Sequence, residues 1–136
     1  METPLPNEKE IRDLIQFLPF LYREGFSPVK KWRGGEKESN AITMPFPEYE
    51  QEVLEFMAAA SKKCWCDYQY DVEYASQVIE DLDRVASASL PELKTLLTYC
   101  VRGERFCDGH MGSMIEKGVI KSILIRLQIL VSDSFL

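Results

Sequence analysis

The sequence predicts an α+β fold dominated by helices, with about five to six helices and a small β-hairpin near residues 29–46 packed on them. Apolar residues recur at spacings of three and four over most of the chain, as on a helix that is buried along one side. Between residues 29 and 47 this spacing stops, and two short extended runs flank the glycine pair Gly34 and Gly35, as in a hairpin. Because a lone two-stranded hairpin is marginally stable in water, we expect it to lie on the helices.

Length and composition indicate one globular domain. The chain has 136 residues, of which 46% are hydrophobic and 28% are charged, and this balance is usual for a protein with its own core. We expect a single domain over residues 1–136, with an ordered core at 7–131 and tails at 1–6 and 132–136.

The first helix is predicted to begin after Asn7, which forms a capping box with Glu10. Its apolar stripe reaches Tyr22, but Pro19 removes one backbone hydrogen bond, so we expect a kink or a break there. A second helix is predicted over residues 49–60 from the same periodicity.

The middle of the chain continues the helical pattern. The aromatic run at residues 65–70 is either a short third strand or a packed loop, and one amphipathic helix is predicted over residues 72–85. A second capping box, Ser89 with Glu92, then starts a helix that runs toward Gly103.

Two helices are predicted after that point. Asp108 is expected to cap a short helix that ends at Gly118, and a last helix follows over residues 119–131. This last helix is apolar on two sides, since Ile125 and Ile129 lie opposite its main stripe. It is therefore either central in the fold or covered by a partner, in which case the protein is a homodimer that self-associates through this face.

A string near the end of the chain, R-x-x-R-F-C-x-G-H from Arg102 to His110, is followed by I-L-x-R-L at residues 123–127. Together with residues 32–37 and 49–56, these residues resemble a family of small prokaryotic proteins known only as a domain of unknown function. The resemblance covers most of the chain and departs at residues 64–66. It implies the domain boundaries and no mechanism.

Cys107 and His110 are the candidate catalytic residues. His110 is the only histidine, and a three-residue spacing on one helix would bring the two side chains together as a thiolate–imidazole pair. Asp108 and Gly109 lie between them and are expected to start a helix, which spoils that geometry. The alternative is a buried cysteine beside a histidine that hydrogen-bonds the turn, so the sequence leans away from an enzyme.

Zinc is the one cofactor that the sequence allows. Cys64, Cys66, Cys107 and His110 together supply three sulfurs and one nitrogen, which is a complete zinc set. Against it, a Cys-x-Cys spacing is less typical of zinc sites, and this half lies where the chain departs from the family. The favoured alternative is no cofactor, with inert thiols in or near a core.

Trp32, Arg102 and Arg105 are candidate ligand-binding residues. The two arginines precede a predicted helix N-terminus, where guanidinium groups and free backbone donors bind phosphate or carboxylate well. Trp32 lies among basic residues and could stack on a base or a sugar. The alternatives are arginines that pair with acidic side chains of the same chain and a tryptophan that covers the core.

These observations favour a non-catalytic interaction or regulatory module of the cytoplasm. The net charge of −6 argues against nucleic acid, and we expect neither an export signal nor a membrane span. Four cysteines without a dense disulfide framework favour a reducing compartment. The alternatives are an enzyme or small anionic-ligand binder, with a pocket around Arg102, Arg105, Cys107 and His110, and a zinc-stabilised domain.

Overall fold

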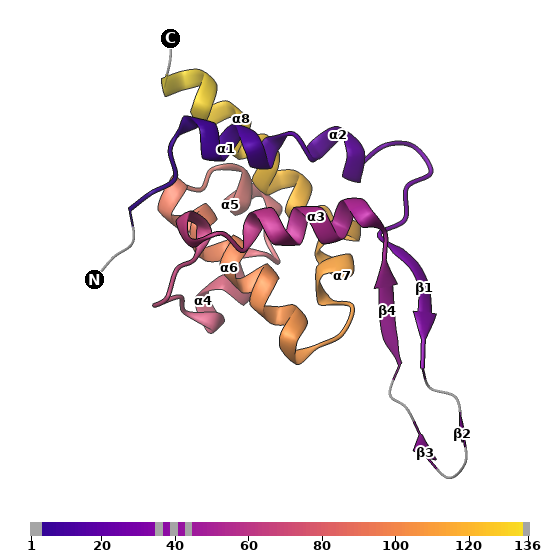
Figure 1. Cartoon of the computed structure of the whole chain (residues 1–136). Coiled ribbons are helices and arrows are strands. Elements are labelled where there is room, and N and C mark those ends of the chain that lie inside the picture. The colour runs from indigo at the N-terminus through magenta and orange to yellow at the C-terminus, as the bar shows by residue number, and fades with distance from the viewer. Residues whose placement is uncertain (1–3, 35–36, 39–40, 43–44, 135–136) are drawn as a thin grey trace.

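The structure is a computed structural model that describes residues 4–34, 37–38, 41–42 and 45–134 (Figure 1). Helices form one body, and a β-hairpin extends from it, as the predicted fold class required. The elements are, in order, α1 (Glu8–Ile15), α2 (Leu18–Leu21), β1 (Val29–Arg33), β2 (Lys37–Glu38), β3 (Ala41–Ile42), β4 (Phe46–Tyr49), α3 (Gln51–Ala60), the 3-10 turn η1 (Lys63–Trp65), α4 (Val72–Val78), α5 (Leu82–Ala86), α6 (Leu90–Phe106), α7 (His110–Glu116) and α8 (Val119–Ser134).

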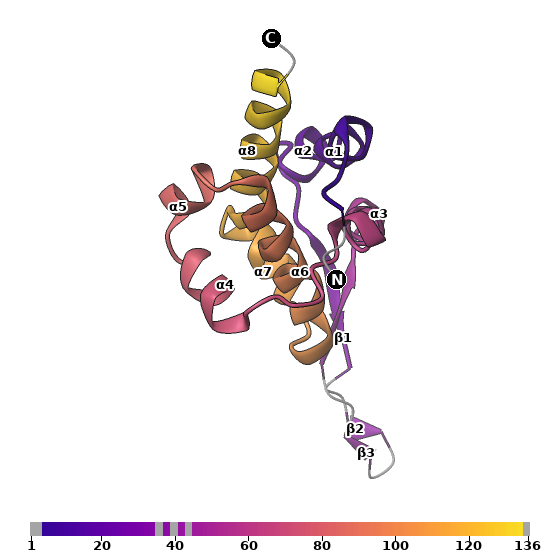
Figure 2. The ribbon, with the colours of Figure 1, turned by 90° about the vertical axis from the view of Figure 1, so that its left-hand side faces the viewer.

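The last helix, α8, is the centre of the fold. It contacts α1, α2, α5, α6 and α7, and Figure 2 shows it between α5 on one side and α1 with α2 on the other. Ile123, Leu124 and Leu127 are completely buried on it, and each such side chain contributes about 1.5–3 kcal/mol through burial. Ile125 and Ile129 keep 38% and 43% of their surface exposed. The helix is therefore central, and self-association through its exposed side stays a prediction.

Two predicted helices are each divided into two, which gives more helical segments than expected. The first breaks after Ile15, because Pro19 stands in the first turn of α2 and not inside a continuous helix. The prediction of one helix over residues 72–85 was wrong. Asp81 ends that run, since its side chain accepts a hydrogen bond from the Asp83 N–H and caps α5.

The aromatic segment after α3 is a packed loop and not a third strand. Trp65 ends η1 and is only 1% exposed. The Asp67 N–H donates to the Thr98 hydroxyl at 2.9 Å, and that hydroxyl also donates to the Trp65 carbonyl at 3.0 Å. These bonds fasten the loop to α6 and satisfy its buried backbone groups.

The hairpin packs on the helices only at its base. Strands β1 and β4 pair antiparallel, and β2 pairs with β3 further from the helical body (Figure 1). A β-bulge between Val29 and Lys31 shifts the register, and it lets Val29 and Trp32 both face α7. A β-carbon added to Gly112 of α7 would lie 3.3 Å from Val29 Cγ2, so β1 and α7 pack closely at this position.

Candidate functional site

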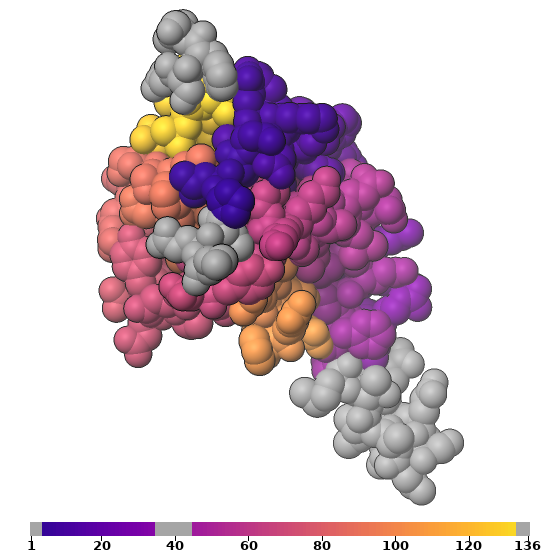
Figure 3. All heavy atoms as spheres, turned by 60° about the vertical axis from the view of Figure 1, so that its left-hand side comes forward, coloured from indigo at the N-terminus to yellow at the C-terminus, as the bar shows by residue number. Residues whose placement is uncertain are grey.

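The R-x-x-R-F-C-x-G-H string spans the end of α6, the turn after it and the first residue of α7, and it lies beside the base of the hairpin. The space-filling view shows the C-terminal end of α6 and the hairpin at the same edge of the molecule (Figure 3). A helix start leaves four backbone N–H groups without partners inside the helix. The hydrogen-bond acceptors of these N–H groups in α7 explain why several residues of the string are present.

Glu104, a residue of α6, supplies most of the cap of α7. Its carboxylate accepts from the N–H of Gly109 at 3.0 Å and of Met111 at 2.8 Å. The Gly112 N–H donates to the Tyr49 hydroxyl at 3.2 Å, and that hydroxyl donates to Glu104 at 2.7 Å. Burial and the bond to Glu104 both raise the pKa of Tyr49 above its ordinary value. A residue of β4 is thereby tied to α6 and α7.

The prediction that Asp108 caps this helix was wrong. The N-cap is Gly109, whose φ of 92° is in the left-handed region that favours glycine, and Asp108 is exposed. The His110 N–H donates to the Cys107 carbonyl at 3.0 Å, so all four initial N–H groups of α7 have partners. This helix N-terminus has no donor left for the anion that was considered as a ligand near Arg102 and Arg105.

Gly103 makes room for the imidazole of His110. A β-carbon on Gly103 would lie 2.5 Å from His110 Nε2, closer than real atoms approach. The imidazole also packs edge-on against Tyr99, with ring centroids 5.1 Å apart. Nε2 is buried and has no hydrogen-bond partner in the described part of the chain. Burial lowers the pKa of His110, although the nearby Glu104 carboxylate opposes this, so the ring is neutral at pH 7.

Gly109 leaves room for the indole ring of Trp32, as Gly103 does for the imidazole of His110. A β-carbon on Gly109 would lie 2.7 Å from the indole Cη2 atom. The indole is thus held against the α6–α7 turn, while 55% of the Trp32 surface stays exposed. A tryptophan that is both fixed in position and open to solvent is well suited to binding, since little conformational entropy is lost when a partner covers it.

Two hollows flank Trp32 and together form what we call the Trp32 cleft. The larger has a volume of about 720 Å³, and the smaller, between β1 and α7, about 430 Å³. Both are lined by Trp32, Gly109 and Ser113. The larger volume is within the range of pockets that hold small ligands or the side chains of a partner.

The lining of the larger hollow combines aromatic, apolar and charged residues. Tyr99, His110 and Trp32 supply the aromatic rings, and Ile79 and Met114 are among the apolar residues. Its charged residues are Glu80, Asp108 and Lys117.

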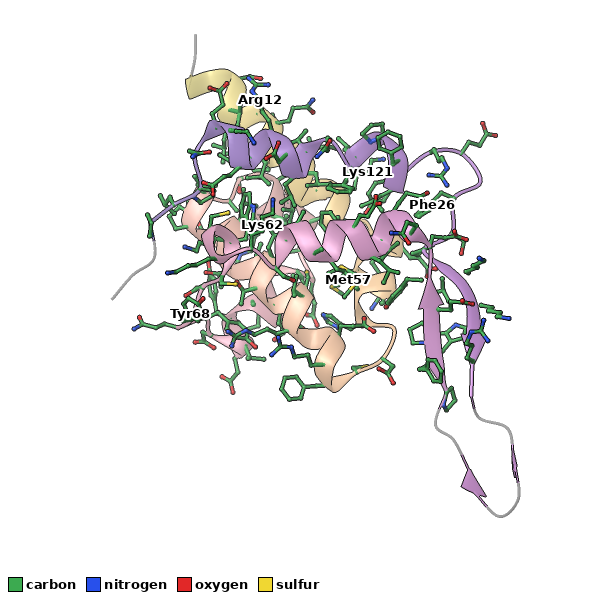
Figure 4. All side chains as sticks on the ribbon, viewed as in Figure 1. Arg12, Phe26, Met57, Lys62, Tyr68 and Lys121 are labelled. Carbon is green, nitrogen blue, oxygen red and sulfur yellow. The ribbon has the colours of Figure 1, made fainter. Side chains whose placement is uncertain are left out.

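The structure brings together two of the four residues around which a pocket was considered, Cys107 and His110, and adds the candidate ligand-binding residue Trp32. Trp32, Cys107 and His110 all line the larger hollow. The Arg102 guanidinium instead lies over the rings of Tyr68 and Tyr70, 6.0 and 5.4 Å from their centroids. Figure 4 shows Tyr68 on the side of the helical body away from the hairpin.

Arg105 is exposed near the end of α6 and is not among the residues that line the cleft. The cation of the cleft wall that sequence reasoning missed is Lys117.

Cys107 and His110 are neighbours, but their side chains are not a hydrogen-bonded pair among the described residues. Cys107 is the exposed C-cap of α6. His110 Nε2 is turned toward Gly103 and is buried there. The bond between these two residues joins their backbones. The alternative of a buried cysteine was wrong for Cys107, because this side chain is exposed at the end of α6.

The four proposed zinc ligands do not gather in one place. Cys64 lies near Glu10, and burial followed by the hydrogen bond to Glu10 raises the pKa of its thiol to about 11. The Cys66 thiol lies 3.5 Å from the carbonyl oxygens of Ser61 and Lys62. Among the residues that the structure describes, no three His, Cys, Asp or Glu side chains are grouped so that they could hold a metal ion.

The fold and the cleft define a class of protein: a small helical domain with a hairpin arm and a cleft where the two meet. The chain belongs to a family of unknown function, DUF6508, whose model matches residues 6–133, which confirms the resemblance to a domain of unknown function. No curated protein and no solved structure matches the chain. None of the helices in the described ranges has the length and apolar character that crossing a membrane requires.

Proposed function

We propose that this protein is a non-catalytic interaction module that holds a segment of a partner protein in the Trp32 cleft. The observation that carries the proposal is the state of Trp32 itself. Its ring is fixed against Gly109, it is 55% exposed, and a hollow lies on each side of it. Tryptophan is enriched among the residues that dominate binding energy at protein interfaces.

The environment of His110 supports binding without catalysis. A general acid or base must come within hydrogen-bond reach of the group that reacts. His110 Nε2 is buried against Gly103, which withdraws one of the two ring nitrogens from acid–base chemistry in the cleft. The neutral ring then serves as part of an aromatic wall beside Tyr99.

A selection from displayed random peptides tests the proposal. We expect peptides that bind the full chain and lose about tenfold or more in affinity on Trp32→Ala, because a central aromatic anchor contributes at least 1.4 kcal/mol. Phe20→Ala is the matched control, since Phe20 is 53% exposed on α2 and does not line the cleft. If no selected peptide distinguishes Trp32→Ala from Phe20→Ala, the proposal is wrong.

A small ligand is the second candidate, because the larger hollow alone has about 720 Å³ and three aromatic rings in its wall. Lys117 would then attract an anionic group of the ligand. Thermal-shift measurements with inorganic phosphate, nucleoside monophosphates and aromatic carboxylates test this candidate. A stabilisation that Lys117→Ala removes would favour the small ligand over the protein segment.

We further propose that the module works in the cytoplasm. All four cysteines are free thiols, and a reducing compartment keeps thiols in that state. Fractionation of the cells that produce the protein, followed by immunodetection, tests this assignment.

A further inference from the structure

We propose that the bound segment is an acidic, extended peptide that pairs as an additional strand with the free edge of β1, in the groove between β1 and α7. This inference rests on the proposed function and specifies the chemistry of the partner. It is carried by three features of the smaller hollow: a strand edge, unpaired lysines and an adjoining apolar hollow.

The strand edge is the first feature. In the described part of the chain, β1 pairs with β4 and with no other strand. The hollow of about 430 Å³ is lined by residues of β1, among them Val29 and Trp32, and by α7 residues such as Gly112 and Ser113, while β4 contributes none of its lining. The hollow therefore lies on the β1 side of the hairpin, and within the described residues no strand covers the edge of β1 that faces away from β4. Backbone N–H and C=O groups on such an edge can pair with an added strand.

Charge selects the kind of peptide. Lys30 and Lys31 line the groove, both are exposed, and neither forms an ion pair with any residue that the structure describes. Arg33, the next cation on β1, is already paired with Glu48 at 3.1 Å. Lys30 and Lys31 do interact electrostatically with Glu48. Because they form no ion pair within the described residues, they favour carboxylates at the matching positions of the added strand.

The same region disfavours nucleic acid. Glu116 lines the groove, and the adjoining hollow contains Glu80 and Asp108. A phosphate backbone lying along the cleft would meet these three carboxylates, and the whole chain has a net charge of −6. A peptide can have carboxylates opposite the lysines and neutral side chains at its other positions. A nucleic acid has one negative charge at every nucleotide.

The larger hollow adds an apolar preference. The hollow of about 720 Å³ shares Trp32 with the groove, and its lining includes Ile79, Met114 and Val119. Alternate side chains of a strand point to the same face, so one apolar or aromatic residue of the peptide would point into this hollow. The expected ligand is therefore an acidic stretch followed or preceded by an apolar anchor.

The test starts from peptides of about ten residues, selected on the full chain from a random display library, because strand addition uses a segment of this length. We expect the selected sequences to be enriched in Asp and Glu around one aromatic or aliphatic residue. One selected peptide is then resynthesised with a single N-methyl group at each position in turn. Strand pairing predicts affinity losses of about tenfold at every second position over the paired region, since only alternate N–H groups face β1.

Charge reversal is the second arm. The double substitution Lys30→Glu with Lys31→Glu should lower the affinity for the selected peptide by about tenfold or more. A fresh selection on this variant should yield fewer acidic sequences. The matched control is Lys62→Glu with Lys63→Glu, another pair of adjacent exposed lysines, located after α3. Far-UV circular dichroism and the emission of buried Trp65 confirm that both double variants are folded.

The outcomes separate this inference from the proposed function. Peptides that need Trp32 but tolerate N-methylation at every position would overturn strand pairing and leave the interaction module in place. Peptides that pair but show no preference for acidic residues would overturn the charge argument. Binding of a ten-nucleotide single-stranded RNA that Lys31→Glu abolishes, with no acidic peptide selected, would replace the peptide by a nucleic acid.

Discussion

Gly103 offers the sharpest test of how the α6–α7 turn is built. In the interior of a helix, replacing glycine by alanine normally stabilises by about 1 kcal/mol. Here the added β-carbon would lie 2.5 Å from His110 Nε2, and overpacking of this kind costs about 1–3 kcal/mol. The expected net effect of Gly103→Ala is a destabilisation of about 1 kcal/mol, which is opposite in sign to the effect of helix propensity alone.

The same substitution should change sign when the imidazole is removed. In a His110→Ala background the space beside Gly103 is open, so Gly103→Ala should stabilise by about 1 kcal/mol. The difference between the two backgrounds is a coupling free energy of about 2 kcal/mol, which is in the range measured for side chains in direct contact.

Urea unfolding of the four proteins, followed by far-UV circular dichroism, gives the coupling directly. The double-mutant cycle cancels the helix propensity of alanine and the loss of the imidazole itself, and only their interaction remains. If Gly103→Ala stabilises both backgrounds equally, the imidazole does not pack on Gly103 and the structural role assigned to this part of the string is wrong.

Three other predictions address the same turn. Gly109→Ala should destabilise by about 1–3 kcal/mol because of its φ of 92° and the Trp32 indole 2.7 Å from the new β-carbon; unchanged urea unfolding would contradict this. Tyr49→Phe should cost about 1–3 kcal/mol, since it leaves the Gly112 N–H and one Glu104 interaction unsatisfied, and a change below 0.5 kcal/mol would count against this network. His110, the only histidine, should titrate below pH 6.5 by NMR because burial lowers its pKa. The folded state then binds fewer protons than the unfolded state, so stability should fall as the pH drops below about 6.5, and His110→Ala should flatten that dependence.

Helix starts were predictable where the cap lies within one turn of the chain. Asn7 with Glu10 and Ser89 with Glu92 both form the capping boxes that their spacing indicates. Asp81 shows the opposite case, because the apolar stripe continues across it at helical spacing while its side chain caps a new helix. Periodicity shows which side of a segment is buried. It does not show whether a single helix continues between two buried residues.

Only part of the lining of the cleft could be anticipated from the sequence, and the structural roles of its residues could not. The string from Arg102 to His110 was recognised as distinctive, and Cys107, His110 and Trp32 do line one hollow. The residue with the most contacts to the turn, Glu104, gave no signal of its own, because its partners are backbone groups of the next helix and a tyrosine of the hairpin. Tyr99 was missed as well, although it lies one helical turn before Gly103 and so on the same side of α6.

The sequence by itself determined the dominance of helices, the place of the hairpin, the burial of the last helix and the family of the chain, since each depends on local spacing or on a contiguous string. Only the tertiary structure decided why the string contains two glycines. Gly103 and Gly109 are required by the rings of His110 and Trp32, and Trp32 lies about seventy residues away along the chain. Close approach between distant segments is a property of packing in three dimensions, and a single sequence carries no direct record of which side chain fills the space that a glycine leaves.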